Sequence, residues 1–174
     1  FVGGIAIPES DTEADLEAAR KFMFEITSSD MMWKDSFWMD PVYLGKYPEE
    51  AIKYNEEWWP KIGQDDLKII NQPLDFFGFN SYQDVTVRAD KNGNPYVVKY
   101  PEGFGRTAMP TWNVTPKIMY YGPKFFYERY KLPILVTENG MSNIDTVFLD
   151  GKVHDPVRID FLNKYLLEYR KAGD

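Results

Sequence analysis

The sequence contains no cysteine and a single histidine, His154, among its 174 residues. The lack of cysteine excludes disulfides and thiolate metal ligands. One histidine also argues against a histidine-based zinc site or a Ser-His-Asp triad. No stretch approaches the roughly 18 apolar residues that a membrane-spanning helix requires. Any enzymatic chemistry is therefore expected to depend mainly on carboxylates, with no metal or other cofactor.

Positive charge is also scarce, because 20 Lys and Arg face 27 Asp and Glu, which gives a net charge of −7. Nucleic acids and anionic membranes would be repelled, so neither is expected as a partner. Aromatic residues are abundant instead, with 12 Tyr, 12 Phe and 5 Trp. Large rings pack protein cores and can also stack on the apolar faces of sugars, so composition alone leaves both interpretations open.

Three short apolar runs are predicted to form strands: residues 1–7, 74–82 and 134–138. Helical patterns follow each run, and strands that alternate with helices predict parallel βα units. A complete (β/α)8 barrel takes about 250 residues and rarely fewer than about 200. This chain is too short to close one. The pattern alone also allows a small doubly wound sheet.

Local signals predict where several helices begin. Ser10 with Glu13 forms a candidate capping box for the first helix. Thr115-Pro116 is predicted to cap a helix that runs to about residue 130, and Asp155-Pro156 to cap the last helix. The buried stripe of that last helix is predicted to contain four residues: Ile159, Leu162, Leu166 and Tyr169.

Between the strands, proline and glycine mark the expected interruptions. Pro41 and Gly45 are predicted to break the aromatic stretch 33–47, and Pro48 to begin a short helix that ends near residue 58. Asn92-Gly93 predicts a β-hairpin between two alternating segments. In this hairpin two valines are expected to face two partners: Val85 and Val87 opposite Tyr96 and Val98.

Polar side chains stand at the ends of two predicted strands. Asn80 and Tyr82 end the second strand, and Glu138-Asn139 ends the third. In parallel α/β folds, active sites lie at the carboxyl ends of the strands. A carboxylate directly after Ile-Leu-Val is hard to explain as ordinary surface solvation. Position alone leaves two hypotheses for Glu138: a catalytic carboxylate, or an acceptor of hydrogen bonds from the following turn.

Four segments resemble motifs of glycoside hydrolase family 1. Residues 132–140 (L-P-I-L-V-T-E-N-G) resemble the nucleophile signature, and residues 74–82 (L-D-F-F-G-F-N-S-Y) resemble the sixth barrel strand, D-F-[IL]-G-[IV]-N-Y-Y. Residues 38–48 (W-M-D-P-V-Y-L-G-K-Y-P) are similar to W-F-L-D-P-x-x-x-G-x-Y-P, and residues 155–162 (D-P-V-R-I-D-F-L) to the helix after the nucleophile. The motifs keep the family order over nearly the whole chain. Ser81 departs from it, since the family usually has tyrosine there.

The resemblance implies an α/β fold, namely an incomplete (β/α)8 TIM barrel of about three βα units, strands five to seven. Residues 1–174 would be a C-terminal-half portion of one barrel domain, incomplete at both ends. The implied activity is that of a retaining β-glycosidase, β-glucosidase-like, acting on a β-glycoside or oligosaccharide. The rest of the barrel, in the same or a second chain, would be a partner, and the isolated chain would be inactive. A cytoplasmic location is expected.

The resemblance also implies individual roles. Glu138 would be the nucleophile, Tyr82 would orient that carboxylate and keep it ionised, and Asn80 would order the same group of residues around the substrate. Trp112 would line the leaving-group side of the cleft, although simple packing explains it equally well. The family's acid/base motif, T-x-N-E-P, does not occur in the sequence. Residues 55–57 (N-E-E) are a poor substitute, because no strand precedes them.

Two other functions stay open at this point. One is a non-catalytic sugar-binding or interaction domain derived from the same fold, and the other is a small α/β protein with repurposed motifs. Loss of the nucleophile would favour the first, whereas Glu138 is intact. Glu138 and Tyr82 occurring together count against the second.

Overall fold

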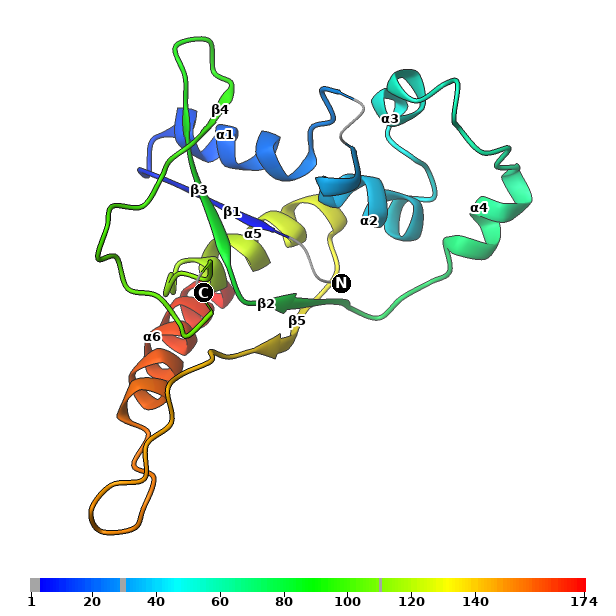
Figure 1. Cartoon of the computed structure of the whole chain (residues 1–174). Helices are drawn as coiled ribbons and strands as arrows, with labels where there is room; N and C mark the ends of the chain where they lie inside the picture. Colours follow the sequence, from blue (N-terminus) through cyan, green and yellow to red (C-terminus); the bar gives the residue numbers. More distant parts are fainter. Residues whose placement is uncertain (1–3, 29–30, 110) are drawn as a thin grey trace.

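A computed structural model describes residues 4–28, 31–109 and 111–174 of the chain (Figure 1). The strand predicted over residues 1–7 is observed from Ile5, and residues 1–3 lie outside the described ranges. In chain order the elements are β1 (Ile5–Pro8), α1 (Glu13–Phe24), η1 (Met31–Trp33), α2 (Asp35–Leu44), α3 (Glu49–Tyr54), α4 (Gln64–Ile70), β2 (Phe77–Ser81), β3 (Asp84–Ala89), β4 (Pro95–Val97), α5 (Ile118–Tyr130), β5 (Ile134–Asn139) and α6 (Pro156–Gly173).

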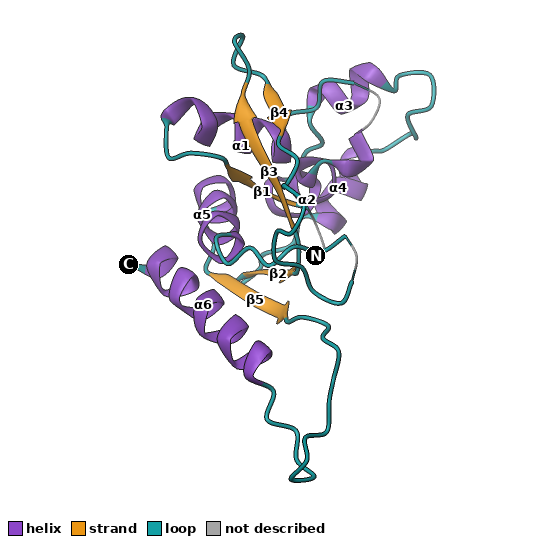
Figure 2. Ribbon diagram, turned by 60° about the vertical axis from the view of Figure 1, so that its left-hand side comes forward, coloured by secondary structure: helices purple, strands orange, loops and turns teal. Residues whose placement is uncertain are grey.

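The strands form two small sheets, each containing one parallel pair (Figure 2). In one sheet β1 pairs with β3, with Ile5 opposite Asp84, and β3 pairs antiparallel with β4. In the other, β2 pairs with β5. The three predicted strands therefore do not form one continuous ladder. β2 continues through residues 82–83 into β3, so this segment meets β5 with its first half and β1 with its second.

The core lies between α5 and the strands and is rich in stacked rings. Phe77 of β2 stacks on Phe126, with centroids 4.6 Å apart, and on Tyr130, with centroids 5.1 Å apart. Gly122 lets α5 approach β1 closely, because a Cβ there would lie 2.9 Å from the Cδ1 atom of Ile5. This packing fixes the amino end of β2, and hence the line of the strand that leads to Asn80.

The predicted capping box at the start of α1 is wrong. Thr12 is the N-cap, and its hydroxyl accepts a 3.4 Å hydrogen bond from the amide of Asp15. Ser10 donates to the Asp15 carboxylate rather than capping the helix itself. The same carboxylate accepts a hydrogen bond of 2.8 Å from the amide of Ala89 on β3. Asp15 is thus bonded both to Ser10 and to a strand that is remote in sequence, which the local pattern could not predict.

The expected break at Pro41 is also wrong, because α2 continues through it to Leu44 and ends at Gly45. Proline removes one hydrogen bond from a helix interior, so other contacts must hold this helix. Asp40 provides them, since its buried carboxylate accepts from Arg129 Nε at 2.9 Å and from the Tyr130 hydroxyl at 3.0 Å. The next helix is shorter than predicted and spans Glu49–Tyr54.

Helix α5 begins at Ile118 rather than at the predicted cap, Thr115-Pro116. The hydroxyl of Thr115 instead donates to Asp84 at 2.7 Å. The last helix does begin with Pro156, but Asp155 does not cap it with its side chain. The Asp155 carboxylate accepts from Arg158 at 2.9 Å. At both helix starts, the side chain that was expected to cap the helix bonds another side chain instead: Thr115 bonds Asp84, and Asp155 bonds Arg158.

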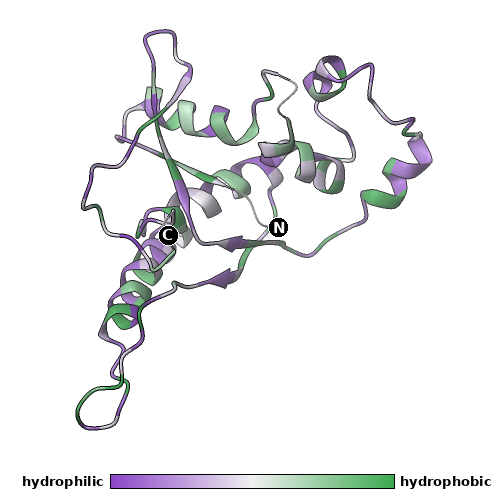
Figure 3. Cartoon of the chain, viewed as in Figure 1, coloured by the Kyte–Doolittle hydropathy of each residue, from purple (hydrophilic) through white to green (hydrophobic). Residues whose placement is uncertain are grey.

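The predicted buried stripe of α6 is mostly wrong. Ile159, Leu162 and Leu166 are 63%, 47% and 60% exposed, whereas Phe161 and Tyr165 are buried. Of the predicted stripe, Tyr169 alone packs partly against the core. The reason is that α6 lies on α5, which covers a narrow face of it (Figure 2). Apolar residues therefore remain on the uncovered surface of this helix (Figure 3).

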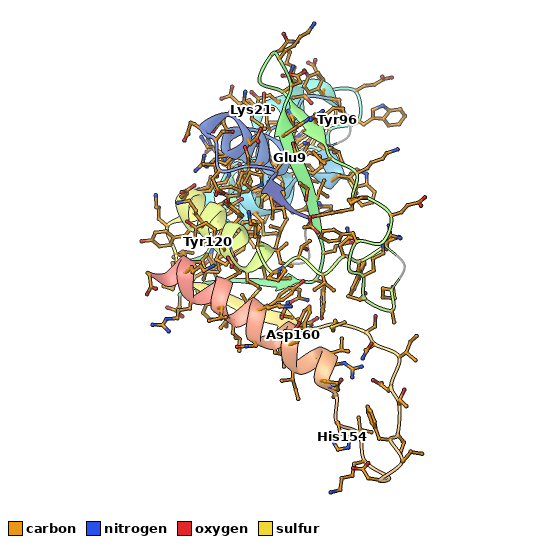
Figure 4. All side chains as sticks on the ribbon, turned by 90° about the vertical axis from the view of Figure 1, so that its left-hand side faces the viewer. Glu9, Lys21, Tyr96, Tyr120, His154 and Asp160 are labelled. Carbon is orange, nitrogen blue, oxygen red and sulfur yellow. The ribbon has the colours of Figure 1, made fainter. Side chains whose placement is uncertain are left out.

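The hairpin forms as predicted, but its register differs. Val87 lies opposite Val97, and Arg88 lies opposite Tyr96. The turn is longer than two residues, because the last strand pair is Ala89 with Pro95. Within the turn, Asp90 accepts hydrogen bonds of 2.8 Å from the amides of both Asn92 and Asn94. Figure 4 shows Tyr96 on this hairpin, at the opposite end of the molecule from His154 on the loop that follows β5.

Candidate active site

The carboxyl ends of β2 and β5 lie side by side and bring the predicted polar residues together. Asn80 is paired with Glu138, and the register shifts between Phe79 and Asn80, which makes Thr137 an extra residue on β5. Such a bulge redirects the side chains that follow it and is common beside active sites. Thr137 Oγ1 donates to Asn80 Oδ1 at 2.6 Å and so links the two strand ends at the bulge.

Glu138 is exposed, and the hydroxyl of Tyr82 donates a hydrogen bond to its Oε2 atom. This bond, together with desolvation and the carboxylate charge, raises the pKa of the Tyr82 phenol. The phenol therefore stays protonated at neutral pH and acts as the donor. One residue further along β5, Asn139 Nδ2 donates to the carbonyl oxygen of Ser81 at 2.7 Å. The two strand ends are thus cross-linked on both sides of Glu138.

Trp112 lies against Tyr82, with ring centroids 5.1 Å apart and an interplanar angle of 27°. Its loop returns on itself, since the Thr107 amide donates to the carbonyl of Trp112 at 2.9 Å. The same loop contacts the segment after β5, where the Ala108 amide donates to the carbonyl of Ser142 at 3.0 Å. The indole is therefore held between the chain segments that carry Tyr82 and Glu138.

A cavity of about 650 Å³ opens beside these residues. Asn80, Tyr82 and Trp112 line it, so three of the four predicted site residues share one space, and Glu138 is joined to it through Tyr82. Two tryptophans that the sequence analysis did not assign to the site also line it, Trp33 and Trp38. The aromatic stretch 33–47 was the available signal, but its pattern does not reveal which rings face a cavity.

Asp35 is a further residue of this cavity that the sequence analysis missed. Its side chain is buried, and its Oδ2 atom has no hydrogen-bond partner among the described residues. Burial raises the pKa of this carboxyl well above its usual range, and the nearby charge of Lys34 offsets only part of that effect. Burial at the amino end of α2 therefore favours the neutral form of this carboxyl group over its ionised form.

Other candidate groups lie elsewhere. Residues 55–57 follow the end of α3, where Glu56 and Glu57 are exposed, so they do not stand at a strand end. Within residues 4–28, 31–109 and 111–174, no group of three or more potential ligands is arranged to hold a metal ion. None of the helices in those ranges is both long and apolar enough to cross a bilayer.

The fold is of the α/β class. A hydrogen-bonded carboxylate stands at the carboxyl ends of two parallel strands, where the active sites of such folds lie, and an indole from a loop stacks on its tyrosine partner. The chain belongs to glycosyl hydrolase family 1, whose sequence pattern matches residues 3–174. Its two open sheets form an incomplete (β/α)8 barrel of this family.

Comparison with known relatives shows what share of a family member's length this chain covers. The 1,4-β-D-glucan glucohydrolase of Thermotoga neapolitana is 32% identical over 173 residues, which cover 99% of this chain and 39% of that protein. One of the aryl-phospho-β-D-glucosidases of Bacillus subtilis is 32% identical over 156 residues, covering 78% of this chain and 31% of that protein.

A solved structure gives the same proportion. The family 1 β-glucosidase from Thermotoga maritima in complex with isofagomine lactam matches with a TM-score of 0.72 and 31% identity, covering 99% of this chain and 37% of that one. The chain thus spans well under half the length of the relatives that it matches.

Proposed function

We propose that this chain supplies the nucleophile side of the active site of a retaining, β-glucosidase-like β-glycosidase. Activity would require the rest of the (β/α)8 barrel, from the same or another chain, and the two together are called the complete barrel below. The observation that carries the proposal is the hydrogen bond from Tyr82 to Glu138 at the carboxyl ends of adjacent parallel strands. Because the chain belongs to family 1, we interpret this bond as the contact between a catalytic carboxylate and the residue that orients it.

The chemistry requires a carboxylate and an orienting donor of this kind. In a retaining glycosidase one carboxylate attacks the anomeric carbon and forms a covalent glycosyl-enzyme. A second carboxyl group, about 5–5.5 Å away, protonates the leaving oxygen and then activates water. Glu138 fits the first role, because the Tyr82 phenol donates a hydrogen bond that can orient its carboxylate. The second group would come from the rest of the barrel, since this sequence lacks the T-x-N-E-P motif.

The cavity beside Tyr82 suits a sugar ring. The faces of Trp33, Trp38 and Trp112 offer apolar surfaces on which a pyranose can stack, and Asn80 offers an amide for its hydroxyls. The substrate would be a β-glycoside or an oligosaccharide. Relatives of the chain are named as β-glucosidases and as aryl-phospho-β-D-glucosidases, so the proposal names the bond rather than one particular sugar.

Glu138→Ala in the complete barrel tests this proposal. Hydrolysis of aryl β-glucosides should fall to background, because the attacking carboxylate is gone. Added azide should enter the vacated space and restore cleavage of an activated aryl glucoside. Its product should be the α-glycosyl azide, since only one displacement then occurs.

The matched control is Glu57→Ala, which removes an exposed carboxylate far from any strand end. That variant should retain normal turnover. The proposal fails if Glu138→Ala also keeps near-normal turnover while its circular dichroism spectrum stays unchanged.

A further inference from the structure

Asp84 stands two residues beyond Tyr82, at the start of β3, and its carboxylate collects three side-chain donors. Its Oδ1 atom accepts from Thr115 Oγ1 at 2.7 Å. Its Oδ2 atom accepts from Thr86 Oγ1 at 3.0 Å and from the hydroxyl of Tyr100. The two threonines are buried, so these bonds are shielded from water. We call these four residues the Asp84 network.

Two of the three donors, Tyr100 and Thr115, flank the loop that carries Trp112, whereas Thr86 lies on β3 itself. Tyr100 precedes the loop, and Thr115 follows Trp112 by three residues. The amide of Thr115 also donates to the buried Tyr165 hydroxyl of α6 at 2.9 Å, which fixes its position. Both ends of the loop are therefore fastened to a single carboxylate.

The middle of the same loop is fastened on the side of Glu138. The Met109 amide donates to the Ser142 hydroxyl at 3.0 Å, and Ser142 follows Glu138 by four residues. The loop thus has one attachment beside Tyr82 and one beside Glu138. Between them Trp112 stacks on the Tyr82 ring and limits how that ring can turn.

We propose that Asp84 is a positioning residue, which holds the Trp112 loop against the strand end of Tyr82 and thereby sets the direction of the bond from Tyr82 to Glu138. The inference rests on the proposed function for its catalytic consequence. A hydrogen bond weakens steeply as its geometry departs from linear, so a small turn of the phenol weakens its bond to the Glu138 carboxylate and lets that carboxylate change direction. Burial and the bond to Asp84 raise the pKa of Tyr100, which keeps that hydroxyl a donor at neutral pH.

Two substitutions weaken the network with little change in side-chain volume. Asp84→Asn replaces one accepting oxygen by an NH₂ group that cannot accept from Tyr100 or Thr86. Thr115→Val removes the hydroxyl that donates to Oδ1. Asp90→Asn is the matched control, because Asp90 accepts from turn amides of the same hairpin and has no bond to the Asp84 network.

In the complete barrel, Asp84→Asn and Thr115→Val should each lower kcat/KM for an aryl β-glucoside by roughly tenfold or more, as expected for a misplaced catalytic group. The double variant should cost less than the two single effects combined. Asp90→Asn should change none of these.

A readout without turnover separates this inference from the proposed function. In protein labelled with 5-fluorotryptophan, the ¹⁹F resonance of Trp112, assigned through Trp112→Phe, should shift in Asp84→Asn and Thr115→Val and stay in place in Asp90→Asn. If the unmutated complete barrel cleaves no glycoside while the resonance still shifts, the proposed function fails and the placement of the loop by Asp84 stands.

An unmoved resonance, or an unchanged kcat/KM in a folded Asp84→Asn variant, overturns the inference even if its melting temperature falls. Tyr100→Phe removes a single donor and keeps the ring packed against Phe104, so it repeats the test if Asp84→Asn does not fold.

Discussion

At the scale of single residues, Glu138 and Tyr82 are hydrogen-bonded, as the polar residues at the strand ends suggested. The sequence could not show which other residues would bond to the segments that carry this pair. The motif around Glu138 is local, so eight or nine consecutive residues indicate it. Thr137 forms the bulge and bonds Asn80, and Asp84 bonds Thr115, across separations of 57 and 31 residues. A one-dimensional pattern carries no record of such pairs. They depend on how two strands and a loop finally pack.

Trp112 has two explanations that one substitution separates. If the indole lines the leaving-group side of the cleft, Trp112→Ala in the complete barrel should change the ratio of kcat/KM between aryl and alkyl β-glucosides by about tenfold, the effect of a few contacts. Steady-state kinetics on both substrates, together with a melting curve, measures this. A large fall in melting temperature with an unchanged ratio would instead assign Trp112 to packing.

Asp35 makes a prediction about pH. Burial raises the pKa of Asp35 in the folded state. At pH values between the unfolded-state pKa and the folded-state pKa, the folded protein therefore binds more protons than the unfolded protein. Over that range the free energy of unfolding falls as the pH rises. Asp35→Asn stays neutral and should lose this dependence. It should therefore be more stable than the parent at pH 7 and should lose that advantage as the pH falls to about 4, the ordinary carboxyl range.

Urea unfolding of the complete barrel between pH 4 and pH 7 measures this effect. Asp65→Asn is the control, because its side chain is 90% exposed. Parallel pH profiles for the parent and Asp35→Asn would show that Asp35 is ionised in the folded protein.

At the scale of elements, strand and helix types followed from the sequence better than helix ends and buried faces did. Periodicity identified the strand that ends at Glu138 and the helix that follows it. The buried face of α6 was mispredicted. The spacing of apolar residues shows which side of a helix could be buried, but not which neighbouring element packs against it or how much of that side it covers. Pro41 was taken as a break because the pattern gives no sign that Asp40 will find Arg129 and Tyr130.

The Asp40 contact predicts how strongly α2 depends on α5. The Asp40 side chain is 5% exposed, and Asp40→Ala would leave the charge of Arg129 and the hydroxyl of Tyr130 without their acceptor. Because Arg129 is 32% exposed, water can solvate part of the remaining charge, so the loss should be about 2 kcal/mol rather than the roughly 3 kcal/mol or more of a fully buried pair. Chemical unfolding of the complete barrel should show this loss. Asp160→Ala on α6 (Figure 4), which removes an exposed carboxylate, should cost well under that, about 1 kcal/mol at most.

At the scale of the whole molecule, the structure is an incomplete barrel with much apolar surface exposed. Leu135 on β5 is 46% exposed, and apolar residues of α6 and of the loop that follows β5 are uncovered as well (Figure 3). Composition and strand order were enough to predict the α/β class and the shortage of length. The split into two sheets was not predictable, because strand pairing depends on which neighbours are present.

The isolated 174-residue chain should therefore associate or lose fixed packing, and should lack glycosidase activity. Exposed strand edges and apolar faces favour self-association. Analytical ultracentrifugation, near-UV circular dichroism and an aryl β-glucoside assay on the purified chain measure these properties. Turnover by the 174-residue species, shown by intact mass to be free of longer protein, would contradict the expectation.

If Glu138 is the nucleophile, it becomes covalently bonded to the sugar during turnover. The most direct test treats the complete barrel with an activated 2-deoxy-2-fluoro-β-glucoside, which slows both steps and lets the glycosyl-enzyme accumulate. Peptide mapping by mass spectrometry should then find the 2-deoxy-2-fluoroglucosyl group on the peptide that contains Glu138, and Tyr82→Phe should slow its formation. A label on any other carboxylate, or inactivation without a label on that peptide, would contradict the account.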